Sequence, residues 1–256
     1  MAPRLLQPTP MHVGRARTTM EAMAPSVPTL RHVRPVRPIE FPSSDPEWDM
    51  GQTGLHQRLC DALYHLLRDA LAPASLVASD PFLYFDAADN RRKCAPDLLV
   101  KLGAPHRLVD TWKTWENGTP DLCVEILSSS DHEKLTLDDK LARYHAIGVP
   151  EVVALDPLAP AGSRLRAWDR VDGDLVERVV DDERTPSVTL GLWLVLAPMP
   201  EEPDLDVALR LARDPLGRDL LPTRTERLRA EKDRERADKE AAVAELARLR
   251  ERLAPK

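Results

Sequence analysis

The sequence predicts an α/β domain with a mixed β-sheet flanked by helices, followed by a separate C-terminal helix. Three observations support this prediction. Apolar residues recur at helical spacing over 53–72 and 131–147, short apolar runs predict strands between and after them, and from residue 223 the chain is nearly pure Arg, Lys, Glu, Asp, Ala and Leu. The order helix, strands, helix, strand, hairpin is typical of a mixed sheet with helices on its faces.

Length and composition set the protein class. The chain has 256 residues, of which 43% are hydrophobic, enough for one domain with extensions. It has no apolar run of the roughly 18 residues that a membrane span needs, and residues 1–30 lack the apolar segment of a signal peptide. We therefore expect a soluble, cytoplasmic protein without membrane partners. Cys60, Cys94 and Cys123 lie far apart and are expected to be reduced core thiols.

The first 46 residues contain nine prolines and no sustained periodicity, which predicts a disordered Pro/Arg-rich arm. Its arginines are either a solvated leader without a role or a contact for an acidic partner. The arm ends where helical periodicity begins, so we place the folded domain at 47–222 and the C-terminal helix at 223–256.

The first helix is predicted over 53–72, where its apolar positions recur at helical spacing and Pro73 closes the segment. His56 and Asp61 lie near the apolar boundary of this helix. A lone histidine in such a place is more often structural than a ligand, so neither residue is assigned a catalytic role.

Strands are predicted over 75–79 and 82–85, followed by a polar loop over 86–92 and two further strands that begin at Asp97 and Asp121. Between these two strands, 110–118 is predicted to be a polar loop. Its Trp112 and Trp115 either pack over the fold or offer a surface for base stacking.

After the second helix come a strand over 151–156, a hairpin of 164–168 with 175–179 around Asp172-Gly173, and a final strand over 188–196. In the C-terminal helix, apolar residues alternate four and three apart, which is the pattern of a short coiled-coil seam: Ala242, Leu246, Leu249 and Leu253. This seam predicts a homodimer, although association through so short a seam alone would be weak.

The candidate site follows from Glu125, which lies inside the apolar run 122–127. A buried carboxylate needs a cation or hydrogen-bond donors, because an unpaired buried charge is very unfavourable. Asp97 stands at the start of another apolar strand, and Lys140 falls on the apolar stripe of the helix over 131–147. These three residues predict an Asp/Glu/Lys cluster. The alternative is a structural ion pair in the core, with Asp97 in a strand-entry turn.

The charge distribution argues against a simple nucleic-acid binder. The net charge is −6, but residues 45–222 carry 19 basic and 32 acidic residues, or about −13. Binding to phosphates requires positive charge, so a DNA substrate would need compensation by cations, by the basic ends or by a partner.

Four stretches carry a resemblance to a known family. They are Ala95-Pro96-Asp97-Leu98-Leu99-Val100, the run from Pro120 to Ser128 with Glu125 inside it, Asp139-Lys140 with Tyr144, and Gly148-Val149-Pro150-Glu151 continuing to Asp156-Pro157. In order and spacing they resemble the Uma-two family of restriction endonucleases, within the PD-(D/E)xK nuclease superfamily. The resemblance covers roughly 50–215 and implies a restriction endonuclease-like fold.

The resemblance also implies a function and its residues. Asp97 and Glu125, with the carbonyl of Ile126, would be ligands of Mg²⁺ or of Mn²⁺ in its place. Lys140 would supply the catalytic lysine from the helix, because Leu127 occupies the usual lysine position two residues after Glu125. The chain departs from the family at Ser128-Ser129-Ser130-Asp131, at Thr136 and at Val152-Val153. These departures leave the trio intact and concern catalytic efficiency and substrate contacts.

The expected activity is Mg²⁺-dependent hydrolysis of DNA by an endonuclease with Asp97, Glu125 and Lys140 as catalytic residues. Two alternatives stay open. One is an inactive nuclease-fold module that acts through protein contacts of its coiled coil, and the other is a phosphohydrolase on RNA or small nucleotides, which would tolerate the acidic surface better.

Overall fold

The computed structural model describes residues 39–41, 54–128, 136–199, 205 and 207–253. Most of the predicted arm and residues 131–135 of the predicted second helix lie outside these ranges. None of the described helices combines the length and the apolar character of a membrane span.

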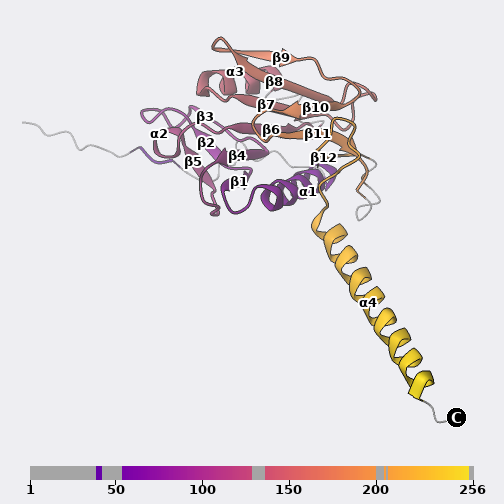
Figure 1. Ribbon diagram of the computed structural model, residues 1–256. Coiled ribbons are helices and arrows are strands. Elements are labelled where there is room, and N and C mark those ends of the chain that lie inside the picture. The colour runs from indigo at the N-terminus through magenta and orange to yellow at the C-terminus, as the bar shows by residue number, and fades with distance from the viewer. Residues whose placement is uncertain (1–38, 42–53, 129–135, 200–204, 206, 254–256) are drawn as a thin grey trace, which may run out of the picture. The chain divides into compact units, whose positions relative to one another are not determined.

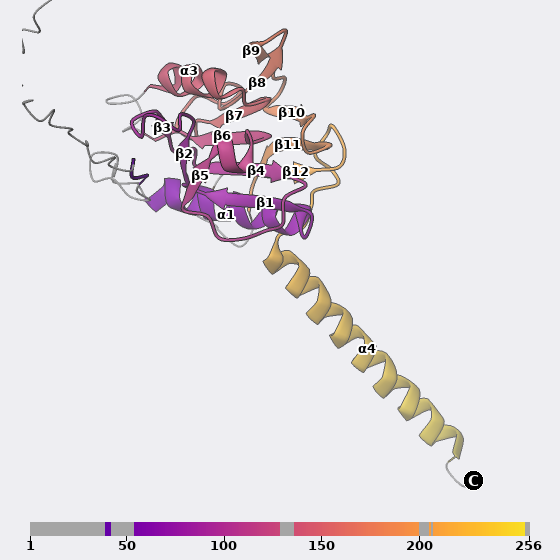
Figure 2. The ribbon, with the colours of Figure 1, turned by 90° about the vertical axis from the view of Figure 1, so that its left-hand side faces the viewer.

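The main sheet has six strands in the order β1-β4-β6-β7-β8-β9. It is mixed, as predicted, because β6 and β7 pair in parallel whereas the other neighbours are antiparallel. Figures 1 and 2 both show β6 between β4 and β7, in the middle of this sheet. The strands are β1 (Ser75–Ser79), β4 (Leu98–Leu102), β6 (Leu122–Ile126), β7 (Glu151–Leu155), β8 (Leu165–Val171) and β9 (Asp174–Arg178).

Two small sheets accompany it. One has the order β3-β2-β5, and the other is an antiparallel sheet with the order β10-β11-β12. Their strands are β2 (Phe82–Tyr84), β3 (Lys93–Cys94), β5 (Thr111–Lys113), β10 (Arg184–Ser187), β11 (Leu192–Ala197) and β12 (Ala208–Ala212).

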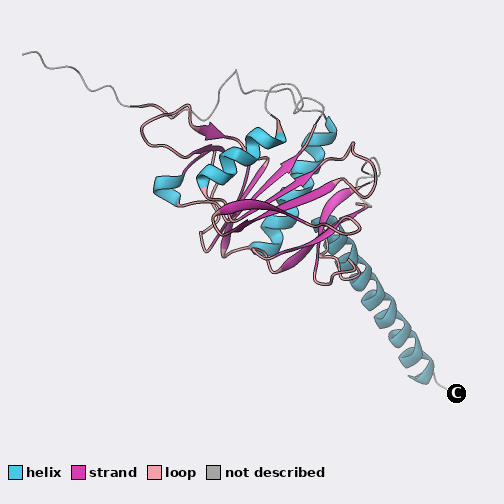
Figure 3. Ribbon diagram, turned by 90° about the horizontal axis from the view of Figure 1, so that it is seen from above, coloured by secondary structure: helices cyan, strands magenta, loops and turns pink. Residues whose placement is uncertain are grey.

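Four helices complete the described chain, and Figure 3 distinguishes them from the strands. They are α1 (Gly54–Leu71), α2 (Thr114–Asn117), α3 (Leu137–Ile147) and α4 (Arg224–Leu253). Helices α1, α3 and α4 confirm the predicted segments within the described ranges.

The prediction of an irregular loop over 110–118 was wrong. Residues 111–113 form β5, which pairs in parallel with β2, and α2 follows directly. Trp112 is buried, and its indole Nε1 donates to the carbonyl of Gly118 at 2.9 Å. A three-residue strand and a one-turn helix are too short to give a periodic signal, so the sequence pattern could not reveal them.

The prediction of one final strand over 188–196 is confirmed for 192–196, which belong to β11, but is wrong for 188–191. Val188 is exposed in a turn between β10 and β11, where the amide of Gly191 donates to the carbonyl of Ser187 at 2.9 Å. Gly191 has φ 65°, a conformation that glycine adopts without strain. The turn therefore joins β10 and β11 in a hairpin over 184–197, and β12 adds a third strand to this sheet.

Two apolar cores lie on opposite faces of the main sheet, because alternate residues of a strand point to opposite faces. Leu122, Val124 and Ile126 of β6 belong to the core that includes α1, whereas Cys123 belongs to the core that includes Tyr144 of α3. Glu125 follows the alternation of Cys123 and so points toward α3.

Residues 39–41 precede the predicted domain boundary but contact the domain. The side-chain amide of Asn90 donates to the carbonyl of Glu40 at 2.8 Å, and the Phe41 ring lies 5.0 Å from that of Tyr84 and 5.2 Å from that of Trp115. The aromatic side chain of Trp115 thus packs over the fold, which was the first of its two predicted roles.

Among the described residues, the ion pairs that join α4 to the rest of the domain come from its first turn. Glu226 accepts from Arg210 at 2.8 Å, and Arg227 forms an ion pair with Asp69. Every residue from 227 to 250 is exposed, including Leu246 and Leu249 of the predicted seam. Pairing of α4 with a second copy stays a prediction.

Candidate functional site

Glu125 occupies the centre of the main sheet. It lies in β6 between β4 and β7, and none of its surface is exposed. Because the side chains of a strand alternate between its two faces, the Glu125 carboxylate points to the same face as Cys123, which is the face that carries α3.

Helix α3 provides two such partners. The Lys140 Nζ donates to Glu125 Oε2 at 2.8 Å, and the Tyr144 hydroxyl donates to Glu125 Oε1. Lys140 and Tyr144 stand four residues apart, so they lie on the same face of the helix. The predicted pairing of Lys140 with Glu125 is present, and Tyr144 adds a second donor from the next turn of the helix.

Local sequence fixes the ends of α3 and therefore the position of both donors. Thr136 and Asp139 form a reciprocal capping box, with the Asp139 amide donating to Thr136 Oγ1 at 3.2 Å and Asp139 Oδ2 accepting from the Thr136 amide at 3.1 Å. Gly148 ends the helix at φ 87°. The Asp139 carboxylate is thus occupied with capping.

Burial dominates the electrostatics of this cluster. Removal from water raises the pKa of Glu125 to about 7, the positive charge of Lys140 lowers it, and the negative charge of Asp97 raises it. Burial, with the nearby Glu125 charge, also raises the pKa of Tyr144, which keeps its hydroxyl protonated as a donor. Negative charge from two carboxylates is therefore concentrated at one place in the sheet.

Asp97 lies directly before β4. The pairing of Leu98 with Val124 places Asp97 next to Glu125 on the neighbouring strand. Its Oδ2 accepts from the backbone amide of Ile126 at 2.6 Å, and its backbone carbonyl accepts from the Asp80 amide at 3.0 Å. These two hydrogen bonds fix both the side chain and the backbone of Asp97.

A second helix also reaches Asp97. His56 Nε2 of α1 lies 3.1 Å from Asp97 Oδ1, and His56 is only 5% exposed. From the sequence, His56 was expected near the apolar boundary of this helix and was assigned no role in the site. Its place on the apolar side of α1 was visible, but the strand that α1 covers is defined only by the tertiary fold.

The three predicted residues do not meet in one mutual contact. Lys140 pairs with Glu125, and Asp97 has other side-chain partners. Lys140 contacts Glu125 from the face of α3, whereas the side-chain partners of Asp97 are His56 of α1 and the backbone of β6. The Asp97 carboxylate contacts β6 beside Glu125. It lies close enough for its negative charge to raise the pKa of Glu125.

Two other acidic residues of the resembling stretches have structural partners at the opposite end of β6. Asp121 lies 3.1 Å from Lys101 Nζ and accepts from the Leu102 amide at 2.7 Å. Glu151 is buried, accepts from Ser187 Oγ at 2.8 Å and pairs with Arg178 at 3.2 Å. Both carboxylates tie strands together and lie apart from Glu125.

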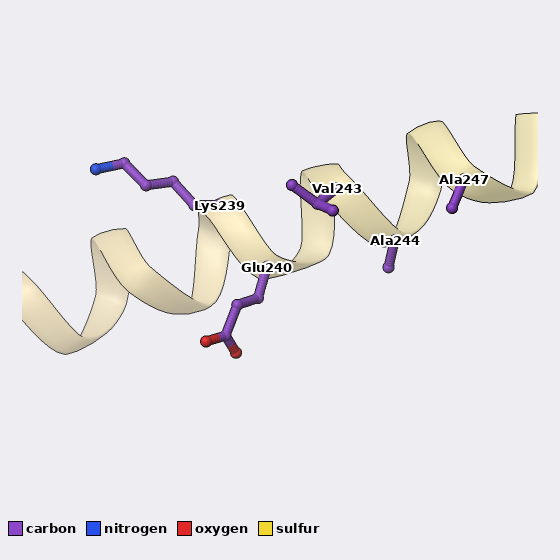
Figure 4. Close-up of a pocket in the computed structure, with 5 residues that line it drawn as sticks. All are labelled: Lys239, Glu240, Val243, Ala244 and Ala247. Atoms are coloured by element: carbon purple, nitrogen blue, oxygen red, sulfur yellow. The ribbon is translucent and has the colours of Figure 1, made fainter. Parts of the chain in front are cut away.

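A shallow depression lies on the surface of α4 (Figure 4). Its lining comes from one helix, namely Lys239, Glu240, Val243, Ala244 and Ala247. With no wall from a second element among the described residues, this depression has no features of a ligand site.

Comparison with known proteins gives two similarities. A family model described as Uma2, putative restriction endonuclease, matches residues 47–199. The crystal structure of a putative nuclease from Anabaena variabilis is 15% identical, with a TM-score of 0.38 over 59% of this chain and 74% of that one. The search of curated proteins gave no match.

Proposed function

Because this chain belongs to the Uma2 family of restriction endonucleases, we propose that its domain over 47–222 is a Mg²⁺-dependent endonuclease that hydrolyses phosphodiester bonds in DNA. The observation that carries this proposal is a fully buried glutamate, Glu125, paired with the buried amine of Lys140 next to a second carboxylate, Asp97.

The donor set fits a hard divalent cation. Asp97 and Glu125 offer carboxylate oxygens, the ligands that Mg²⁺ prefers. The amide of Ile126 points toward Asp97, and in an extended strand the amide and carbonyl of one residue face the same neighbour, so the Ile126 carbonyl is directed to the same side. Burial raises the pKa of Glu125 and the negative charge of Asp97 raises it further, and a cation shared between the two carboxylates would relieve this repulsion.

When bound, Mg²⁺ would screen the phosphate charge and acidify the attacking water. The side chains of the domain would bind this ion and position the attacking water. Asp97 and Glu125 hold the ion, their orientation set by Ile126 and by Tyr144 respectively. Lys140, delivered by α3 next to Glu125, orients the attacking water or stabilises negative charge on the phosphate.

The acidic body makes DNA binding depend on the cation and on the basic ends of the chain. With about −13 on 45–222, phosphate contacts cannot come from a general positive surface. We therefore expect DNA binding to require divalent ions and to weaken as the salt concentration rises. The exposed length of α4 favours one alternative, a non-catalytic module that binds other proteins through this helix.

Cleavage of supercoiled plasmid with Mg²⁺, Mn²⁺ or EDTA tests the proposal. Cutting should require the ion and be lost in Asp97→Asn, Glu125→Gln and Lys140→Met. The matched control is Asp121→Asn. Asp121 directly precedes β6 and its carboxylate pairs with Lys101, so this variant should cut the plasmid normally.

The same panel separates the alternatives. Cutting of RNA or a small phosphodiester but not of plasmid would favour the phosphohydrolase, and no metal-dependent cutting of any substrate by a folded protein would exclude the enzyme and leave the binding module. Circular dichroism of each variant shows whether lost activity reflects lost structure.

A further inference from the structure

We propose that His56, Cys60 and Asp97 form a second metal position, which takes Zn²⁺. His56 and Cys60 lie on α1 and Asp97 lies directly before β4, His56 contacts Asp97, and all three residues are buried. One ligand atom from each residue falls within 4.8 Å of the other two. Their chemistry, one imidazole, one thiol and one carboxylate, differs from the all-oxygen set proposed for Mg²⁺ and suits Zn²⁺.

The spacing of the donors fits this ion. His56 and Cys60 stand four residues apart and therefore share one face of α1. The Cys60 Sγ lies 3.7 Å from His56 Nδ1 and 3.8 Å from Nε2, and Nε2 lies 3.1 Å from Asp97 Oδ1. Neighbouring ligands of a tetrahedral Zn²⁺ are about 3.3–3.6 Å apart, so the separations of His56 from Cys60 and from Asp97 lie close to those of a zinc site.

The local field favours a cation and disfavours a bare thiolate. Burial raises the pKa of the Cys60 thiol strongly, and the negative charges of Asp97, Asp61, Asp80 and Glu125 raise it further. The carboxylates that repel a thiolate attract a divalent ion. Binding of Zn²⁺ would therefore release the thiol proton and form the thiolate at the metal. Without metal, the same residues form a histidine–aspartate pair beside a reduced thiol.

Asp97 belongs to both positions, so they are coupled. Zn²⁺ on His56 and Cys60 would engage the carboxylate on which the proposed Mg²⁺ position depends. In this respect the inference rests on the proposed function, but binding of Zn²⁺ itself does not. A Zn²⁺ complex can therefore be detected whether or not the protein cuts DNA.

Titration of the full chain with Co²⁺, a coloured substitute for Zn²⁺, tests the proposal. One equivalent should give a thiolate-to-cobalt band in the near ultraviolet and the visible bands of a tetrahedral site, and Zn²⁺ should displace both. Cys60→Ala should abolish the thiolate band. His56→Ala should weaken Co²⁺ binding by more than about 100-fold, beyond the 10–100-fold typical of residues that only support a ligand.

Matched controls come from the other buried cysteines. Cys94 and Cys123 are equally buried but lie in the core that contains Tyr144, on the opposite face of the sheet. Cys94→Ala and Cys123→Ala should keep the full cobalt spectrum. Asp97→Asn, which preserves side-chain size, should weaken binding while the circular dichroism spectrum stays native.

Three results would overturn the proposal. They are a thiolate band that survives in Cys60→Ala, a band lost equally in all three cysteine variants, and a folded wild-type protein that binds neither Co²⁺ nor Zn²⁺. Failure of the nuclease proposal would look different, as absent plasmid cleavage in Mg²⁺ with an intact cobalt spectrum.

Discussion

Replacement of Lys140 by methionine is the sharpest test of the buried pair with Glu125. The two side chains are 9% and 0% exposed, with 2.8 Å between Nζ and Oε2. Methionine keeps much of the packing but removes the charge, so Glu125 is left buried without its cation. Breaking such a pair costs about 3–5 kcal/mol, a large share of the roughly 5–15 kcal/mol that stabilises a typical domain.

The cost should depend on pH in a direction that follows from Glu125. Its pKa in the folded protein is already about 7, and loss of the Lys140 charge raises it further above its unfolded value. At low pH the folded variant protonates Glu125 and avoids a buried charge, whereas at high pH it cannot. The loss in free energy of unfolding should therefore be larger at about pH 8 than at about pH 5.

Urea unfolding of wild type and variant at both pH values gives these free energies. Lys101→Met is the matched control, since Lys101 pairs with Asp121 at 3.1 Å on the same sheet but both side chains are about a quarter exposed. It should cost only about 1 kcal/mol. Adding Glu125→Gln to Lys140→Met should recover part of the loss. Equal, pH-independent losses in the two lysine variants would refute the reasoning.

Three further predictions follow from the same contacts. Tyr144→Phe removes a donor to a charged group and should lower the free energy of unfolding by about 1.5–3 kcal/mol, and a loss below about 0.5 kcal/mol in urea unfolding would contradict this. Glu125, with a pKa of about 7, must lose its proton to bind a cation, so Mg²⁺ should raise the melting temperature more at about pH 8 than at about pH 6; equal shifts would count against Glu125 as a ligand. Truncation after Ala230 keeps the contacts of Glu226 and Arg227, so the melting temperature should stay unchanged in calorimetry while sedimentation shows a dimer reduced to a monomer. A wild-type protein that sediments as a monomer would contradict the coiled-coil prediction.

Much of the fold could be read along the chain because its signals are local. Apolar runs marked β4, β6 and β7, and helical spacing marked α1 and α3, since periodicity depends only on neighbouring residues. The same local logic placed Lys140 and Tyr144 on one face of a helix and made Glu125 point inward. Their contact then needed only that α3 cover β6.

Short and irregular elements could not be predicted from local periodicity. The strand β5, the helix α2 and the turn at Gly191 are too brief to carry a period, and they form because Trp112 and its neighbours have partners elsewhere in the fold. The strand β12 is recognisable only through its pairing with β11.

The sequence by itself determined that an acid and an amine would be buried together, because a charged side chain in an apolar strand requires a partner and Lys140 stood on the apolar stripe of the helix that follows this strand. The tertiary structure alone decided what surrounds Asp97. It brings His56 and Cys60 of α1 against the start of β4, a contact between distant segments that no local period encodes. Local spacing fixes which face a side chain occupies, whereas only the packing of elements fixes what that face meets.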